Sequence, residues 1–245
     1  MTKEDVLKNC TVEGMVVKLP KGDFVDKKTY LQVKTAIEKI GGKWKGGKVF
    51  GFQFKEDPTN LMNDIAGGVK RDIKKEFQFF ATPPELADQV VSLAGLNSKH
   101  KVLEPSAGDG AIVKAVNRSI SDMVVHCYEK MPLNIEELKK INTAKLVGED
   151  FLSHGRTKFD RIVANPPFSN NQDIDHVMKM YNSLKKGGRL VAITSTHYLD
   201  SKQKKESEFN QWRSEVGAVV HKVKAGAFKK SGTSVKTVIL VIDKK

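Results

Sequence analysis

Apolar runs of strand length alternate with segments of helical periodicity along the last two thirds of the chain. The apolar runs that predict strands cover residues 100–104, 123–128, 145–147, 159–164, 189–194, 218–222 and 235–242. The segments that predict helices, the last of them polar, cover residues 84–94, 111–120, 133–141, 173–184 and 204–215. This alternation favours an α/β domain in which helices cover a mostly parallel sheet. Residues 185–188, Lys-Lys-Gly-Gly, are expected to end the fourth helix.

The first 72 residues have a different pattern and predict a small α+β module of their own. Residues 12–19 indicate a strand, residues 28–40 an amphipathic helix, and residues 48–54 an alternating strand. Residues 64–76 are expected to link this module, residues 1–72, to a domain over residues 76–245.

Between the helix and the second strand of the module lies a glycine-rich, basic segment around Trp44. Two interpretations stand. In one, the segment is a mobile finger whose Lys43, Lys45 and Lys48 contact phosphates while Trp44 stacks on a base. In the other, Trp44 packs under a tight hairpin and the lysines face water.

The strand over residues 159–164 ends in Asn165-Pro166-Pro167-Phe168. The two prolines fix their own backbone angles and remove two N–H donors. The side-chain oxygen of Asn165 and the carbonyl of Pro166 can then both accept from one planar amine, such as the exocyclic amino group of adenine. The alternative is an ordinary turn, since Asn and Pro are common turn residues.

A second candidate site follows the strand over residues 100–104, where the loop Glu104-Pro105-Ser106-Ala107-Gly108-Asp109-Gly110 leads into a helix. Small residues in such a loop let a ligand approach the backbone. The third glycine of the dinucleotide fingerprint is absent, because Val113 occupies its position. The acids Glu104 and Asp109 would repel a pyrophosphate but favour an ammonium or sulfonium group, as in S-adenosylmethionine.

Acids also stand at the ends of the next two strands, at Glu129 and at Asp150, which precedes Phe151. Solvated surface charges are the alternative for each acid alone. Because the carboxyl ends of parallel strands meet at one edge of a sheet, we expect these groups to face a common ligand.

Taken together, these segments resemble the S-adenosylmethionine-dependent adenine-N6 DNA methyltransferases in which the cofactor motifs precede the catalytic one. Residues 79–87, with an aromatic-x-Thr-Pro sequence before a helix, resemble the N-terminal cofactor motif of that group. Residues 226–233 resemble its closing hairpin. The resemblance covers residues 76–245 and implies a Rossmann-like class I methyltransferase fold, with seven strands of which the last is antiparallel. The short segment before the domain is similar to those of phage-type proteins and suggests a phage or mobile-element origin.

The resemblance implies a role for each motif residue. It places Thr82 at the methionine end of the cofactor, Glu129 at the ribose and Asp150 at the adenine, with Asn165 on the target amine and Phe168 stacked on the target base. The residues implied for the cofactor are Phe80, Thr82, Pro83, Glu104, Pro105, Ala107, Gly108, Asp109, Gly110, Glu129, Asp150, Phe151 and Asn165. Those implied for catalysis are Asn165, Pro166, Pro167 and Phe168. Candidate nucleic-acid contacts are Lys43, Trp44, Lys45, Lys48, Lys229 and Lys230. No metal is expected.

Two departures from the family pattern keep alternatives open. Phe168 stands where DNA adenine enzymes often have Tyr, and the same tetrapeptide occurs in enzymes that methylate amino groups of ribosomal RNA. The 77 residues after Phe168 are needed to complete the sheet and leave no room for a target-recognition domain. Adenine methylation of DNA is therefore the leading hypothesis. An RNA amino-methyltransferase acting on adenine or guanine in rRNA or tRNA, and a non-catalytic nucleic-acid-binding protein on the same scaffold, are the alternatives.

The charge of the chain is unevenly distributed. The net charge is +13 overall, +6 over residues 1–75, −3 over residues 76–175 and +10 over residues 176–245. A basic surface beside an acidic cofactor site suits a protein that binds a polyanion, with DNA favoured over RNA as the partner.

Cys10 and Cys127 lack disulfide or metal spacing, and neither a signal peptide nor a membrane span is evident. We expect a cytoplasmic protein of a bacterial or phage-infected cell, of undetermined oligomeric state.

Overall fold

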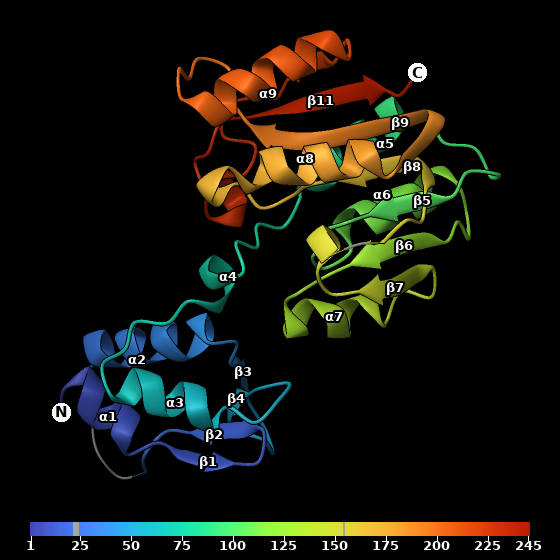
Figure 1. The fold of residues 1–245 in the computed structure, drawn as a ribbon. Coiled ribbons are helices and arrows are strands. Elements are labelled where there is room, and N and C mark those ends of the chain that lie inside the picture. The colour runs from blue at the N-terminus through green and yellow to red at the C-terminus, as the bar shows by residue number, and fades with distance from the viewer. Residues whose placement is uncertain (22–24, 154) are drawn as a thin grey trace. The chain divides into compact units, whose positions relative to one another are not determined.

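The computed structural model describes residues 1–21, 25–153 and 155–245, which form two compact units (Figure 1). The first unit comprises residues 1–77 and the second residues 78–245. Each unit has its own sheet.

The second unit is built on seven strands in the order β10-β11-β9-β8-β5-β6-β7. The strands are β5 (Val102–Glu104), β6 (Val125–Tyr128), β7 (Ala144–Gly148), β8 (Phe159–Ala164), β9 (Leu184–Ser195), β10 (Val219–Lys222) and β11 (Thr237–Asp243). β11 is antiparallel to both of its neighbours, and the other ladders of the described strands are parallel. The predicted seven-stranded, mostly parallel sheet with an antiparallel last strand is confirmed.

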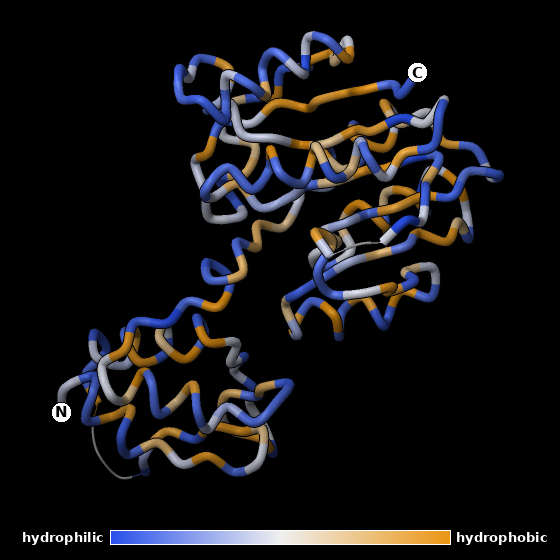
Figure 2. Tube along the Cα trace, in the orientation of Figure 1, coloured by the Kyte–Doolittle hydropathy of each residue, from blue (hydrophilic) through white to orange (hydrophobic). Residues whose placement is uncertain are grey.

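Helices cover both faces of this sheet (Figure 1). They are α5 (Pro84–Ala94), α6 (Ala111–Ser119), α7 (Pro132–Leu138), α8 (Gln172–Asn182) and α9 (Lys204–Glu215). Buried residues of α5, α6 and α7 share one core cluster, and those of α8 and α9 share the other. β9 contributes to both clusters, because Val191 points to the first and Leu190 to the second. Figure 2 shows β11 as an almost continuous apolar run, as a strand covered on both faces requires.

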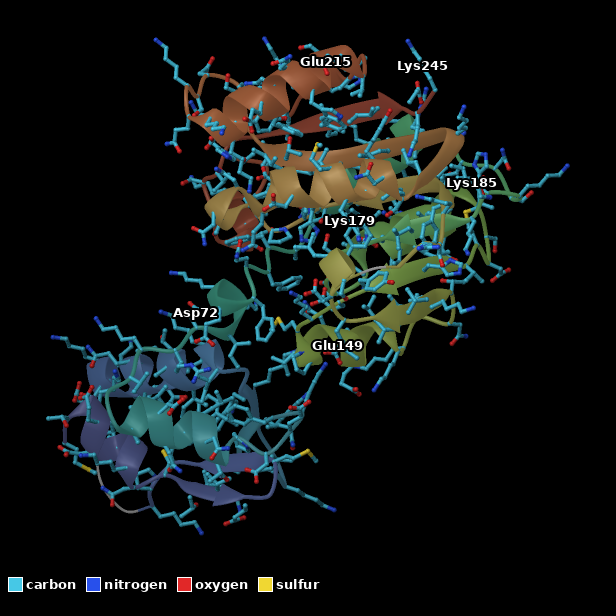
Figure 3. All side chains as sticks on the ribbon, in the orientation of Figure 1. Asp72, Glu149, Lys179, Lys185, Glu215 and Lys245 are labelled. Carbon is cyan, nitrogen blue, oxygen red and sulfur yellow. The ribbon has the colours of Figure 1, made fainter. Side chains whose placement is uncertain are left out.

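The order of the strands determines where a ligand can bind. β5 begins the βαβ run toward β6 and β7 on one side and pairs with β8 on the other. The chain adds β6 and β7 on one side of β5 and then β8 on the other, so the order of the strands reverses between β5 and β8, although these two strands are parallel. Ligands of open α/β sheets bind beyond the carboxyl ends of the strands at such a point. Figure 3 labels Glu149, which follows the carboxyl end of β7, and Lys185, the second residue of β9. The two residues therefore mark the carboxyl and amino ends of the parallel strands.

The expectation that residues 185–188 end a helix is wrong. α8 ends at Asn182, and β9 begins at Leu184 and contains all four residues. In the pairing of β8 with β9, Phe159 lies opposite Leu184 and Arg161 lies opposite Arg189. Residues 185–188 of β9 therefore have one residue of β8 opposite them and form an irregularity in the pairing. An ion pair of 2.9 Å between Lys185 Nζ and Asp160 Oδ1 holds this irregular start of β9.

The first unit has a four-stranded antiparallel sheet in the order β1-β2-β4-β3, with helices packed against it (Figure 1). Its elements are α1 (Lys3–Lys8), β1 (Thr11–Glu13), β2 (Val16–Lys18), α2 (Lys27–Lys39), β3 (Lys43–Lys45), β4 (Gly51–Gln53), α3 (Thr59–Ala66) and α4 (Ile73–Glu76). The single strand expected over residues 12–19 is wrong. A turn at Gly14, whose φ of 59° suits glycine, splits it into the β1–β2 hairpin.

The buried clusters imply that the second unit folds without the first. Two clusters contain residues of the second unit alone and the third contains residues of the first unit alone. We therefore predict that a chain of residues 78–245 gives the circular dichroism spectrum and the single cooperative thermal transition of a folded α/β domain. A fragment that is unfolded, or that melts without cooperativity, would contradict this assignment of the cores.

Candidate active site

The side-chain amide of Asn165 is held in one orientation at the end of β8. Its Nδ2 donates to Thr82 Oγ1 at 3.0 Å and to the carbonyl oxygen of Phe80 at 3.3 Å. Its Oδ1 is buried and has no hydrogen-bond partner among the described residues. A buried acceptor without a donor is costly. Among the described residues, the oxygen is therefore the one polar atom of this side-chain amide left without a partner.

The backbone of Asn165 is tied to the loop after β5. The hydroxyl of Ser106 donates to the Asn165 carbonyl at 3.1 Å. The contact follows from the parallel pairing of β5 with β8, in which Leu103 lies opposite Ile162. The sequence-predicted catalytic motif and the sequence-predicted cofactor loop are thus adjacent at the point where the strand order reverses.

The loop between β5 and α6 is shaped by its glycines. Gly108 has φ of 56° and Gly110 has φ of 81°, values that L side chains rarely adopt. A Cβ atom at Gly108 would lie 2.8 Å from Cε2 of Phe79, so the ring of Phe79 lies directly against the bare backbone of the loop. The N–H of Ala107 is bonded to the Tyr128 carbonyl at 2.9 Å, which fixes the loop to the end of β6.

Glu129, the residue after β6, braces the same loop. One carboxylate oxygen accepts from the Gly108 N–H at 2.7 Å, and the other accepts from the Met131 N–H at 2.8 Å. Burial raises the pKa of Glu129 despite these bonds. Nδ2 of Asn134 also donates to Oε1, the oxygen bonded to Met131, at 3.4 Å, so Oε2 is the oxygen with more capacity left to accept a ribose hydroxyl.

Glu104 is the most deeply buried acid of the loop, with 2% of its surface exposed. Its Oε2 has no hydrogen-bond partner among the described residues. Burial first, then the negative charges of Glu129 and Asp109, raise the pKa of Glu104 well above the usual 4.5, and a hydrogen bond with the Val113 backbone opposes this shift. Three carboxyl groups close together, one of them buried, favour a cationic ligand.

Asp150 and Phe151, after β7, are held differently from each other. Lys130 lies 2.9 Å from Asp150, and its hydrogen bond lowers the pKa of that carboxyl group. Phe151 is 1% exposed and packs edge-on against Tyr128, so its ring presents no free face to a ligand. Asp150 is half-buried and is the more accessible of the two.

Phe168 meets the connection between β10 and β11. Its ring lies 6.4 Å from the ring of Phe228 in an edge-to-face arrangement. The short helix η3 (Lys229–Ser231) follows, and both of its lysines are exposed. The hydroxyl of Ser231 donates to the Ala81 carbonyl at 2.7 Å. The segment before α5, the catalytic motif and this connection therefore converge, and Lys229 and Lys230 directly follow the ring that meets Phe168.

Several residues of the site were missed at the level of sequence. Phe79 contacts Gly108, whereas the sequence motif indicated Phe80. The side chain of Gln78 accepts from the N–H of Ser169 at 2.8 Å and so anchors the end of the motif. The aromatic pair before Thr82 was the available signal for Phe79, but nothing in the sequence indicated Gln78.

The segment after Phe168 is strained and anchored. Asn170 and Asn171 have φ of 56° and 59°, left-handed values that asparagine tolerates better than most residues. Nδ2 of Asn171 donates to Glu206 of α9 at 2.6 Å. Behind it, the fully buried Asp173 accepts from the N–H and the hydroxyl of Ser195, at 2.9 and 2.7 Å. These bonds fix the start of α8 to the end of β9 and so hold the motif in place.

The residues predicted as nucleic-acid contacts at Lys43, Trp44, Lys45 and Lys48 belong to the first unit. A groove of about 1510 Å³ also lies within the first unit, lined by the start of α1, by α2 and by residues 69–72, and none of the motif residues lines it. Among the described residues no group of three or more His, Cys, Asp and Glu side chains could hold a metal ion. No helix in the described part of the chain is long and apolar enough to cross a membrane.

Comparison with known proteins gives a family and a fold. Residues 89–223 match the family described as methyltransferase small domain. No curated protein sequence matches the chain.

Solved structures with the same fold include a restriction-modification methyltransferase subunit and a dimethyladenosine transferase. The type I restriction-modification methyltransferase subunit of Streptococcus thermophilus is 19% identical with a TM-score of 0.57, over 68% of this chain and 44% of its own. A dimethyladenosine transferase of Plasmodium falciparum is 19% identical with a TM-score of 0.52, over 68% of this chain and 64% of its own. TrmN of Thermus thermophilus is 17% identical with a TM-score of 0.52, over 91% of this chain and 70% of its own. This chain thus spans less than half the length of the first of these proteins.

The raised pKa of Glu104 has a measurable consequence for stability. A carboxyl group whose pKa is higher in the folded than in the unfolded state contributes no penalty below the unfolded value. As pH rises from the unfolded toward the folded value, the unfolded state ionises first, so the group lowers the free energy of unfolding progressively, and the loss is complete above the folded value. We predict that Glu104→Gln gains stability relative to the unmodified protein as pH rises above 4.5. Urea unfolding of the ligand-free proteins between pH 4.5 and pH 8 measures this difference.

The exposed residue Glu149 provides the control for the loss of one negative charge, as Glu149→Gln. The measured quantity is the difference in free energy of unfolding between Glu104→Gln and the unmodified protein. If this difference is the same at every pH, the burial of an ionisable group at this position is contradicted.

Proposed function

The chain belongs to the methyltransferase small domain family, and we propose that it transfers a methyl group from S-adenosylmethionine to the exocyclic amino group of adenine in DNA. The observation that carries this proposal is the orphaned acceptor of Asn165. Its amide donors are occupied by Thr82 and Phe80, and its oxygen is buried without a partner. An amine is the ligand that this oxygen lacks.

The chemistry of Asn165 follows from that orientation. The amino nitrogen of adenine is a poor nucleophile because its lone pair is delocalised into the ring. Hydrogen bonds from its two protons to Asn165 Oδ1 and to the Pro166 carbonyl favour a more tetrahedral nitrogen. The same two oxygens offset the positive charge that develops as the nitrogen gains a methyl group, before it loses a proton. Because the amide is already fixed, this stabilisation needs no reorganisation.

The residues of the loop after β5 fit S-adenosylmethionine. Its reactive sulfonium supplies the electrophilic methyl group. The buried, unpartnered oxygen of Glu104 and the nearby Asp109 suit the positive charges of the methionine end. Glu129 is the candidate acceptor for ribose hydroxyls, and Asp150 is the candidate partner for the adenine amino group. The bare backbone at Gly108 lets the ligand approach closely.

The target base needs a surface on which to stack once it has left its helix. The half-buried ring of Phe168, supported edge-on by Phe228, is the candidate for that surface. Lys229 and Lys230, which follow Phe228 in the chain, are the candidate contacts to flanking phosphates. A base stacked on Phe168 would hold its amino group near Asn165, three residues earlier.

DNA is favoured because the Thr82 segment accompanies the catalytic motif, and in this chain Thr82 accepts directly from Asn165. An RNA amino-methyltransferase acting on adenine or guanine is the second candidate. Phe168 in place of Tyr favours that alternative, and a solved structure named as a dimethyladenosine transferase has the same fold.

We predict that Asn165→Ala lowers the rate of methyl transfer at least about 100-fold, because a preorganised acceptor is lost. Cofactor binding, measured by calorimetry, is expected to be largely retained. The neighbouring Ser169→Ala, at an exposed position four residues on, is the matched control and should retain activity. Turnover of Asn165→Ala near the unmodified rate would refute the assignment.

The substrate itself is identified by incubating the protein with isotopically labelled S-adenosylmethionine and duplex DNA, single-stranded DNA or RNA. Products are digested to nucleosides and identified by mass. We expect labelled N6-methyldeoxyadenosine from DNA. Label in RNA nucleosides alone would transfer the proposal to the second candidate, and no label on any substrate with cofactor bound would refute nucleic-acid methylation.

A further inference from the structure

Three aromatic rings form a row on the hairpin of β3 and β4 in the first unit. β3 is an edge strand, and its Trp44 lies directly opposite Phe52. The ring centroid of Trp44 is 5.1 Å from that of Phe52 and 5.4 Å from that of Phe50, both edge-to-face. Phe52 is fully buried, whereas Trp44 is 37% and Phe50 70% exposed. The row thus rises from the core of the unit to its surface.

Phe50 lies at the surface and has a strained backbone conformation. Its φ of 40° lies in the left-handed region, which is unfavourable for a large side chain. It is also the most exposed of the large apolar side chains in the described residues. Gly46, Gly47 and Gly51 stand nearby in the sequence, yet the strained position carries a phenylalanine. Strain of this kind is concentrated at functional sites.

The surroundings of the aromatic row are basic. Residues 40–54 contain three lysines and no acid. All three, Lys43, Lys45 and Lys48, are exposed, and none forms an ion pair with a described residue. Because side chains alternate along a strand, Lys43 and Lys45 point to the face of β3 opposite that of Trp44. One strand edge therefore offers aromatic rings on one side and cations on the other.

We propose that this aromatic–lysine hairpin, residues 43–52, binds an unpaired stretch of nucleic acid, with bases against Trp44 and Phe50 and phosphates at the lysines. A nucleotide has an apolar, planar base and a charged phosphate on opposite sides of its sugar, which matches the two sides of β3. Bases inside a duplex are already stacked on their neighbours and leave no face for these rings. The partner is therefore unpaired, and this binding does not depend on the proposed methyl transfer.

The probe for this surface is a short oligothymidylate. Thymine has no exocyclic amino group, so the oligonucleotide tests the hairpin and leaves Asn165 without its proposed ligand. The full chain contains two tryptophans, and Trp212→Phe leaves Trp44 as the single fluorophore. Trp212 stacks on Phe209 in the second unit, and phenylalanine retains an aromatic ring there. We expect oligothymidylate to quench the fluorescence of this variant in a saturable manner.

The deciding variant is Phe50→Gly, in the full chain. It should fold, because glycine adopts a positive φ freely and the replaced side chain is mostly exposed. Thermal unfolding checks this. We expect its affinity for oligothymidylate to fall roughly 5- to 150-fold, the range for loss of one stacked base, with the same salt dependence as the unmodified protein. Phe77→Ala, which removes another exposed aromatic ring, is the matched control and should bind normally.

The contribution of the hairpin lysines to binding is tested by separate variants. Lys45→Ala should reduce the slope of log affinity against log salt by about 0.7 for one phosphate contact on a single strand. Lys28→Ala, at an exposed lysine of α2 outside the hairpin, should leave the slope unchanged.

Three results would overturn the proposal: unmodified affinity in Phe50→Gly, absence of Trp44 quenching, or binding of a thymine–adenine duplex as tightly as the single strand. Asn165→Ala separates the two proposals. If it loses methyl transfer and still binds oligothymidylate, both stand. If it retains methyl transfer, the catalytic assignment fails and the hairpin proposal is unaffected.

Discussion

The two hydrogen bonds donated by the Asn165 amide are the constraint on which the candidate site depends. They join the end of β8 to the segment before α5, which is more than 80 residues away in the chain. Because both donors are occupied, the oxygen of the side chain is the group left to face a ligand. Ser106 adds the loop after β5 to the same residue. Three segments that form the site are therefore oriented by one side chain and its backbone.

The electrostatics of the site oppose those of the rest of the chain. The chain carries a net charge of +13, yet its candidate cofactor loop contains a buried Glu104 close to Glu129 and Asp109. Burial of an acid without a compensating partner destabilises a fold. The arrangement is explained if a cation occupies the loop during function, since binding would relieve both the desolvation and the repulsion. A neutral hydrogen-bond donor could satisfy the buried oxygen of Glu104 but would leave the repulsion between the carboxylates.

Most of the second unit follows from its sequence, because apolar runs of strand length and helical periodicity alternate there without ambiguity. The meeting of the motif segments follows as well, since parallel strands place their carboxyl ends at one edge of the sheet. The prediction that residues 185–188 end a helix was wrong. A lysine-glycine sequence suits a helix end, but here the pairing of β9 with β8 and an ion pair to Asp160 determine the structure. The burial of Phe151 and the anchor at Gln78 depend on contacts distant in sequence, which local patterns do not contain.

Each unit, taken by itself, combines an edge-to-face aromatic pair with exposed lysines. In the second unit the pair is Phe168 and Phe228, followed by two lysines of η3. In the first it is Trp44 and Phe50, on a hairpin without acids. Aromatic rings gain from stacking on a base when that base is not already stacked, and lysines gain from phosphates whatever the sequence. Under the two proposals, both units would therefore bind unpaired nucleotides in preference to an intact duplex. An enzyme that modifies a base amine has this requirement in any case, because the amine must leave its pair to reach Asn165.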